Sequence, residues 1–210
     1  MKIALFGATG TIGQRILKEA LSRGHEVTAV VREISRLNEE HERLTVVTGD
    51  LLDPGSVAEA VKGHEAVITA YGPQFGAEAE LLEAARSLIE GMRRAEVSRL
   101  LIVGGAGSLE VSPGVYLMDT PEFPEEVRPL AMAHADAYEL YRESELEWTY
   151  LSPASTIEPG PRFGNFRIGT DKLITDEMGA SKITAEDYAA AMIDELEDPY
   201  FIRARFTVAY

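Results

Sequence analysis

The chain has 210 residues, of which 45% are hydrophobic and 26% charged, a composition typical of one globular domain. Its 20 basic and 35 acidic side chains give a formal net charge of −15, which disfavours binding to nucleic-acid phosphates. The chain contains no cysteine, so disulfides, thiolate nucleophiles and cysteine-ligated metals are excluded.

Short apolar runs alternate with helical patterns along the first 105 residues. In chain order they predict strand 2–6, helix 11–23, strand 26–31, strand 44–48, helix 54–61, strand 65–70, helix 77–94 and strand 99–104. The run from Leu100 to Val103 is continuously apolar, as expected for a parallel strand that helices cover on both faces. This order predicts an α/β fold with a doubly wound parallel sheet of the Rossmann type.

The pattern loosens beyond residue 105 into two stretches rich in glycine and proline, 105–129 and 153–180. Around them we expect helix 130–145, strand 148–152, helix 185–197 and a last strand at 205–208. No internal repeat or linker divides the chain, so we expect one domain spanning residues 1–210. Two long loops beside one sheet are typical of the walls of a ligand site.

A glycine-rich segment joins the first predicted strand to the first predicted helix, where a dinucleotide-binding fingerprint lies. Gly7 suits a tight turn, Gly10 lets the backbone approach a pyrophosphate, and Gly13 allows close packing of helix on strand. The free N–H groups at the start of the helix attract the anion. We therefore expect the dinucleotide to be bound by Gly7, Thr9, Gly10, Thr11, Ile12 and Gly13.

The end of the second predicted strand bears on the choice of cofactor. An acidic residue there would bind the ribose 2′-hydroxyl of NAD, whereas Arg32 can pair with the 2′-phosphate of NADP. Arg36 can add a second positive charge from the following turn. We expect NADP to be preferred, with NAD as the alternative if Glu33 points inward.

Two further strands end where an open α/β sheet binds its ligand. Asp50 and Leu51 follow the third strand, and Ala70, Tyr71 and Gly72 close the fourth. Asp50 either accepts a hydrogen bond from the adenine amino group or forms a turn. We expect Tyr71 and Gly72 to lie beside the central ribose and the nicotinamide.

Five segments of the chain, GATGTIG, VVR, GDLLD, VGGAGSL and RESELEWTYLSPA, resemble the atypical short-chain dehydrogenase/reductase group that includes NmrA-like proteins. The likeness is greatest to the subgroup of flavin reductase and biliverdin-IXβ reductase. In this group a serine follows the fifth strand, and backbone groups after the sixth strand meet the nicotinamide carboxamide. The resemblance implies that Ser108 is catalytic and that Pro153 and Ser155 contact the cofactor.

The chain departs from the Tyr-x-x-x-Lys pair of typical short-chain dehydrogenases, which exchanges a proton with the substrate oxygen. The tyrosine position holds Leu130 and the lysine position holds His134, while Tyr138 and Arg142 come one to two turns too late. His134 either packs under a loop or orients the acceptor as a hydrogen-bond or proton donor. Loss of the pair favours reduction of a conjugated acceptor, whose protons can come from water.

We therefore expect an NAD(P)H-dependent reductase that transfers hydride from NADPH to a flavin, quinone or similar acceptor, with Ser108 and His134 orienting that acceptor. One alternative is an NmrA-like redox sensor that binds the dinucleotide without catalysis. Another is an enzyme similar to NAD-dependent sugar-nucleotide epimerases. Phe163, Phe166 and Arg167 either contact the acceptor or close their loop against the domain.

The remaining signals concern metals, location and partners. His25, His41 and His64 lack carboxylates at ligand spacing, so we expect no metal site. The apolar N-terminal segment is too short for a signal peptide or a membrane span, so a cytoplasmic protein is expected. We expect a small-molecule partner, no nucleic acid or membrane, and a monomer or weak homo-oligomer.

Overall fold

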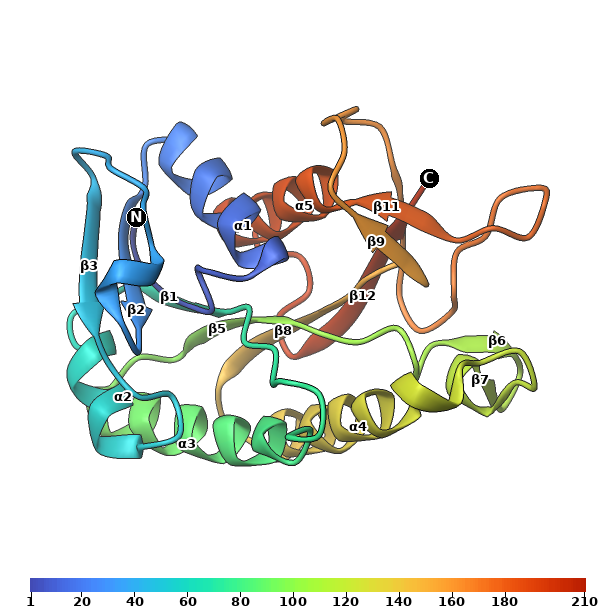
Figure 1. The fold of residues 1–210 in the computed structure, drawn as a ribbon, viewed down its shortest axis with the longest axis horizontal. Coiled ribbons are helices and arrows are strands. Elements are labelled where there is room, and N and C mark those ends of the chain that lie inside the picture. Colours follow the sequence, from blue (N-terminus) through green and yellow to red (C-terminus); the bar gives the residue numbers. More distant parts are fainter.

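A sheet of eight strands in the order β10-β12-β8-β5-β4-β1-β2-β3 forms the centre of the computed structural model, which describes residues 1–210 (Figure 1). All neighbouring strands pair in parallel except β10, which is antiparallel to β12. The strands are β1 (Lys2–Phe6), β2 (Glu26–Val31), β3 (Leu44–Thr48), β4 (Ala66–Thr69), β5 (Arg99–Val103), β8 (Glu147–Ser152), β10 (Arg167–Gly169) and β12 (Ala204–Ala209). The predicted doubly wound α/β sheet is confirmed.

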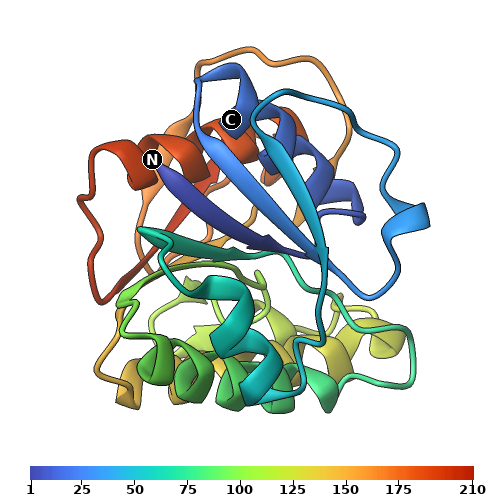
Figure 2. The ribbon, with the colours of Figure 1, turned by 90° about the vertical axis from the view of Figure 1, so that its left-hand side faces the viewer.

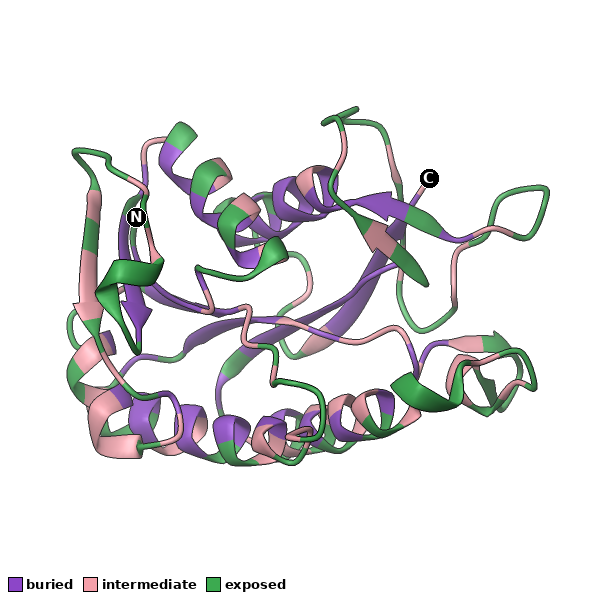
Figure 3. Ribbon diagram, viewed as in Figure 1, coloured by how far each residue is buried: buried purple, intermediate pink, exposed green.

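Helices cover both faces of this sheet (Figure 2). One face carries α1 (Thr11–Ser22) and α5 (Ala185–Glu197), and the other carries α2 (Pro54–Val61), α3 (Glu80–Ala95) and α4 (Arg128–Glu143). Alternate residues of β1 point to the two layers: Leu5 belongs to the apolar cluster under α1 and α5, and Phe6 to the cluster under α2, α3 and α4. Burial on both faces explains why the central strands are continuously apolar (Figure 3).

Local capping fixes where two of the helices begin. The Asp53 carboxylate accepts hydrogen bonds from the N–H groups of Gly55 and Ser56, and Pro54 occupies the first turn of α2. The Thr184 hydroxyl accepts from the N–H of Asp187 at the start of α5. These signals are local in sequence, and both helices span the predicted residues. None of the helices is long and apolar enough to cross a bilayer.

The two stretches predicted as irregular contain short elements. A hairpin of β6 (Glu110–Ser112) and β7 (Val115–Tyr116) lies in the first, and β9 (Thr156–Glu158) in the second pairs in parallel with β11 (Lys182–Thr184). The prediction of loops was wrong for β6, β7, β9 and β10. Strands of two or three residues are too short to show a periodicity, and their pairing partners are set by the tertiary fold.

Candidate functional site

Two adjoining cavities lie along the carboxyl ends of the central strands. We call the first the arginine cavity, because it is lined by Arg32 and Arg36 as well as by the ends of β1, β2, β3 and β4. We call the second the apolar cavity; it has a volume of about 880 Å³. The two cavities share four lining residues, Gly10, Ala70, Tyr71 and Gly72. A single extended ligand can therefore reach both.

The glycine-rich turn between β1 and α1 forms part of both cavities and depends on the absence of side chains. Gly7 has a φ of +79°, and a Cβ atom there would collide with the carbonyl oxygen of Ala70. A Cβ atom on Gly13 would collide with the carbonyl oxygen of Gly7. At Gly10 the nearest atom to an added Cβ is 3.5 Å away, so this glycine is not required by the fold itself. It leaves space in front of the first turn of α1, which has no side-chain cap.

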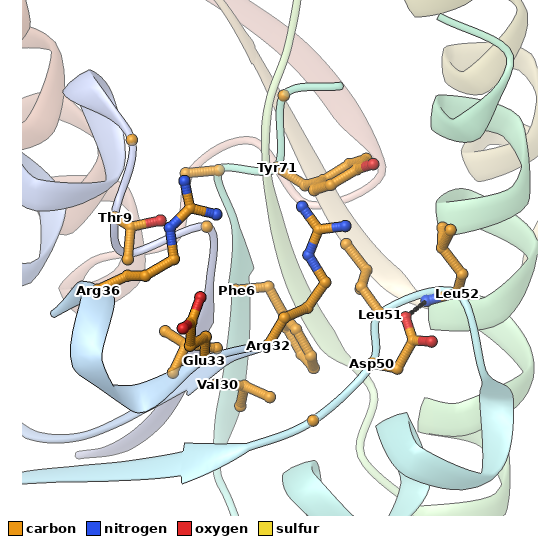
Figure 4. A pocket seen from close by; sticks show the side chains of 16 residues that line it. Phe6, Thr9, Val30, Arg32, Glu33, Arg36, Asp50, Leu51, Leu52 and Tyr71 are labelled. Carbon is orange, nitrogen blue, oxygen red and sulfur yellow. Dashed lines mark hydrogen bonds between the residues drawn. The ribbon is translucent and has the colours of Figure 1, made fainter. Parts of the chain in front are cut away.

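Arg32 follows β2, and Arg36 ends the short 3₁₀ helix at Ile34–Arg36. Figure 4 shows both guanidinium groups directed into the arginine cavity, with Arg32 ending beside Tyr71. Neither arginine makes an ion pair or a side-chain hydrogen bond within the chain, and both are exposed. The exposed Glu33 lines the same cavity. Two unpaired arginines beside a glycine turn are suited to binding phosphate groups.

Two other predicted residues of the arginine cavity have defined partners. The Asp50 carboxylate accepts a hydrogen bond of 3.0 Å from the N–H of Leu52, which is the turn alternative for this residue (Figure 4). The Tyr71 hydroxyl donates to the carboxylate of Glu80, and burial together with this carboxylate raises the pKa of Tyr71. Tyr71 is therefore a neutral ring held at the junction of the two cavities. Leu51 and Gly72 also line the arginine cavity.

Beyond the segments near Gly10 and Tyr71, the apolar cavity is bordered by the segment after β5, the region from Leu117 to His134, and the segment after β8. Close packing of the first wall depends on glycines, since a Cβ atom on Gly105 would lie 2.9 Å from His134 and one on Gly107 would lie 2.6 Å from Ala131. The loop can therefore lie directly against α4. Leu130 also lines the cavity, so the two positions that hold tyrosine and lysine in typical short-chain dehydrogenases face this space.

His134 is held in an environment that disfavours its charged form. Burial lowers its pKa from 6.5 to about 4, so the imidazole is neutral at physiological pH. Its Nδ1 lies 3.5 Å from the hydroxyl of Tyr150, which donates to the His134 carbonyl oxygen and accepts from the N–H of Gly105. His134 can hydrogen-bond to a ligand, but it is not a charged acid near neutral pH.

Ser108 lies apart from His134. Its Oγ accepts a hydrogen bond of 2.9 Å from Arg205, whose buried guanidinium also pairs with Asp171 at 2.8 Å and lies 4.9 Å from the ring centroid of Tyr138. Ser108 lines a separate cavity beside β10 and β12, whereas His134 lines the apolar cavity. The structure thus does not bring together the two residues expected to orient an acceptor, because Arg205 holds the serine hydroxyl.

The segment after β8 contributes only its first residues to the apolar cavity. Pro153 and Ser155 line it, but the N–H and hydroxyl of Ser155 both bond to Ser181, at 3.2 and 3.0 Å. Farther along, the ring of Phe163 packs edge-on against Tyr210, with 5.4 Å between ring centroids. Phe166 packs against the core under α1 and α5, and Arg167 donates to backbone carbonyl groups. Residues 158–180 form no wall of the apolar cavity.

The sequence analysis placed a wall of the ligand site at residues 105–129 and named His134, but it did not single out the other residues around the start of α4 that line the apolar cavity. Phe123 and Pro124 lie just before this helix and line the apolar cavity. Val127, Leu130, Ala131 and His134 recur at helical spacing and line it too. That spacing was a signal that one face of the helix meets the ligand site.

Comparison with known proteins gives one family match and several similar structures. Residues 7–199 match the family model described as NAD(P)H-binding. The full length of this chain is similar to the structure of a candidate exported protein of Burkholderia pseudomallei, with 47% identity, a TM-score of 0.92 and coverage of 100% of that chain. It is similar over its full length to a candidate epimerase of Bacteroides thetaiotaomicron, with 45% identity, a TM-score of 0.93 and coverage of 96% of that chain. A candidate NADH-flavin reductase of Streptococcus pneumoniae is 35% identical, with a TM-score of 0.89 and coverage of 100% and 99%. The three names differ, so the similarity alone does not select a reaction.

Proposed function

Because the chain belongs to the NAD(P)H-binding family, we propose that it is a reductase that uses NADPH to reduce a conjugated acceptor such as a flavin or quinone. The observation that carries the proposal is the continuity of the two cavities at Gly10, Ala70, Tyr71 and Gly72. One cavity has unpaired arginines, and the other has apolar walls. The name of the candidate NADH-flavin reductase of Streptococcus pneumoniae supports the same reaction class.

The residues of the arginine cavity fit a phosphorylated dinucleotide. The glycine turn from Gly7 to Gly13 and the uncapped start of α1 would hold the pyrophosphate. Arg32 and Arg36 would hold the 2′-phosphate, which is the basis for proposing NADPH over NADH. When bound, this cofactor supplies hydride at C4 of its nicotinamide. The residues from Ala70 to Gly72 and Pro153 to Ser155 would then border the nicotinamide end.

The residues of the apolar cavity would position the acceptor and exclude water. Phe123, Val127 and Leu130 offer apolar contacts to a flat ring system. The neutral His134 would hydrogen-bond to a carbonyl oxygen or ring nitrogen of the acceptor and so orient it. The tyrosine and lysine that exchange protons with a carbonyl substrate are replaced here by leucine and histidine. A conjugated acceptor can instead take its proton from water.

An anaerobic assay tests this function. NADPH is titrated into the protein while its fluorescence is followed, and a flavin or quinone is then added while the absorbance of reduced nicotinamide is recorded. We expect saturable binding and then protein-dependent oxidation of NADPH. The matched control is Gly10→Ala, which adds a methyl group at the proposed pyrophosphate site without a collision inside the fold.

Two other results would contradict the reductase. Binding without oxidation of any acceptor favours the redox-sensor alternative, and turnover of a sugar nucleotide without net oxidation of NADPH favours the epimerase alternative. The reductase proposal also places the protein in the cytoplasm, where NADPH is available. Cell fractionation tests this location against the exported one named for the Burkholderia relative.

A further inference from the structure

The apolar cavity contains almost no charge. Among its 24 lining residues, Glu122 is the only one with a charged side chain, since the low pKa of His134 keeps the imidazole neutral. No lysine or arginine contributes to the lining. In the arginine cavity, by contrast, Arg32 and Arg36 are both unpaired. The two ends of the proposed site therefore differ in the charge that they can accommodate.

The wall beside the acceptor is also acidic as a whole. Between Leu117 and His134 the chain has four acidic residues, Asp119, Glu122, Glu125 and Glu126, and a single basic residue, Arg128. The Arg128 guanidinium is paired with Glu125 at 3.0 Å, donates to the carbonyl oxygen of Met118, and lies 5.7 Å from the ring centroid of Phe123. These contacts hold the Arg128 guanidinium, and Arg128 is not among the residues that line the cavity.

The amino end of α4 is already complemented by acidic side chains. The amino end of a helix attracts anions, and α4 begins at Arg128 beside this cavity. Glu125 and Glu126 lie in the turn just before it and complement the positive end of the helix dipole. A phosphate group, with a charge of about −1.5 to −2 at pH 7, would meet Glu122 without a partner cation.

We infer that the acceptor is an uncharged conjugated ring system, such as a quinone or a flavin without phosphate, and not a phosphorylated flavin or a nucleotide. The inference rests on the proposed reductase function and names its substrate class. Apolar walls from Phe123, Val127 and Leu130 would contact the ring faces, and His134 would hydrogen-bond to a ring carbonyl. Discrimination against anions comes from Glu122 and from the lack of any cation in the lining.

Riboflavin and FMN form a matched pair for the test, because they share the ring system and the ribityl chain and differ by one phosphate. Initial rates are measured under nitrogen at saturating NADPH. Binding is measured separately, from the quenching of flavin fluorescence by protein saturated with NADP⁺. We expect both kcat/KM and affinity to favour riboflavin by about tenfold, because the phosphate of FMN would lie near the Glu122 carboxylate with no cation in the lining.

The variant Glu122→Lys should reduce the preference for riboflavin over FMN to about threefold or less, since it places a cation in the lining. The control is Glu126→Lys, which makes the same change of charge on an exposed residue outside the lining and should retain the preference. Equal or better binding and turnover of FMN by the native protein would overturn the inference while leaving the reductase in place. If riboflavin, FMN and menadione all fail to oxidise NADPH, the proposed function is rejected. The ratio of riboflavin affinity to FMN affinity would still test whether the apolar cavity disfavours a phosphate.

Discussion

The arginine cavity and the apolar cavity are assembled from the chain in different ways. The first draws on the ends of four strands, β1 to β4, and the turns that follow them, all within the first 72 residues. The second combines the same glycine turn with residues from 103–107, 117–134 and 153–157. A site made from consecutive turns can be recognised as a motif, whereas a site made from distant segments depends on how those segments pack. The residues that line the arginine cavity were accordingly the easier of the two sets to predict.

The two cavities also differ in their chemistry. Unpaired guanidinium groups at one end suit a ligand that carries phosphates, and apolar walls with one carboxylate at the other end suit an uncharged ring. Tyr71 and the glycine turn are common to both ends. Under the proposed function, this division would separate recognition of the cofactor from selection of the acceptor. Each end can be tested by substitutions that leave the other unchanged.

The largest expected effect comes from disrupting the turn common to both cavities. Gly13→Ala should lower the free energy of unfolding by about 3 kcal/mol or more, because the added Cβ would collide with the carbonyl oxygen of Gly7. Urea denaturation followed by circular dichroism measures this change. The control is Gly10→Ala, whose added Cβ meets no atom closer than 3.5 Å and which should weaken NADPH binding without a comparable loss of stability. Equal stability of the two variants would contradict the packing argument.

His134 should make the protein sensitive to acid. Its pKa is about 4 in the folded protein against 6.5 ordinarily, so the unfolded chain binds more protons between these pH values. Stability should therefore fall as the pH is lowered from about 6.5 to about 4, with His134 contributing about 3 kcal/mol over that window. His134→Gln should remove this part of the pH dependence in urea titrations, with the exposed His41→Gln as control. An unchanged slope in His134→Gln would refute the assignment.

Cofactor selectivity provides an intermediate effect. Arg32→Ala should weaken NADPH binding by about 10- to 100-fold, as expected for loss of a charge-assisted hydrogen-bonded pair, and NADH binding by less than about threefold. Fluorescence titration of both cofactors gives the ratio. Arg142→Ala is the matched control, because Arg142 pairs with Glu139 away from both cavities. Equal losses for NADPH and NADH would remove Arg32 from recognition of the 2′-phosphate.

The smallest effect is expected at Ser108. The hydroxyl is bound by Arg205 outside the apolar cavity, so Ser108→Ala should change acceptor turnover by less than about twofold. His134→Gln, inside the cavity, should lower it by about tenfold through poorer orientation of the acceptor. Steady-state rates with a quinone provide the comparison. A larger loss at Ser108 than at His134 would restore the serine to the role that the family resemblance implies.

Much of the fold and the grouping of residues around the arginine cavity followed from local sequence. The glycine turn, the apolar strands and the caps at Asp53 and Thr184 each act within a few residues, and the family match is consistent with the dinucleotide-binding motif. The surroundings of Ser108 were not predictable in this way, since Arg205 lies 97 residues farther along the chain. The packing of Phe163 against Tyr210 likewise depends on the tertiary fold.

Hydride transfer from bound NADPH can be tested with cofactor deuterated on a single face of C4. The two diastereomers are each oxidised by the protein with a quinone acceptor, and the mass of the NADP⁺ product is measured. A cofactor held in one orientation between the arginine cavity and the apolar cavity exposes one face of the nicotinamide. We predict complete loss of deuterium from one diastereomer and complete retention in the other. Oxidation with similar loss from both, or no oxidation at all, would contradict the account.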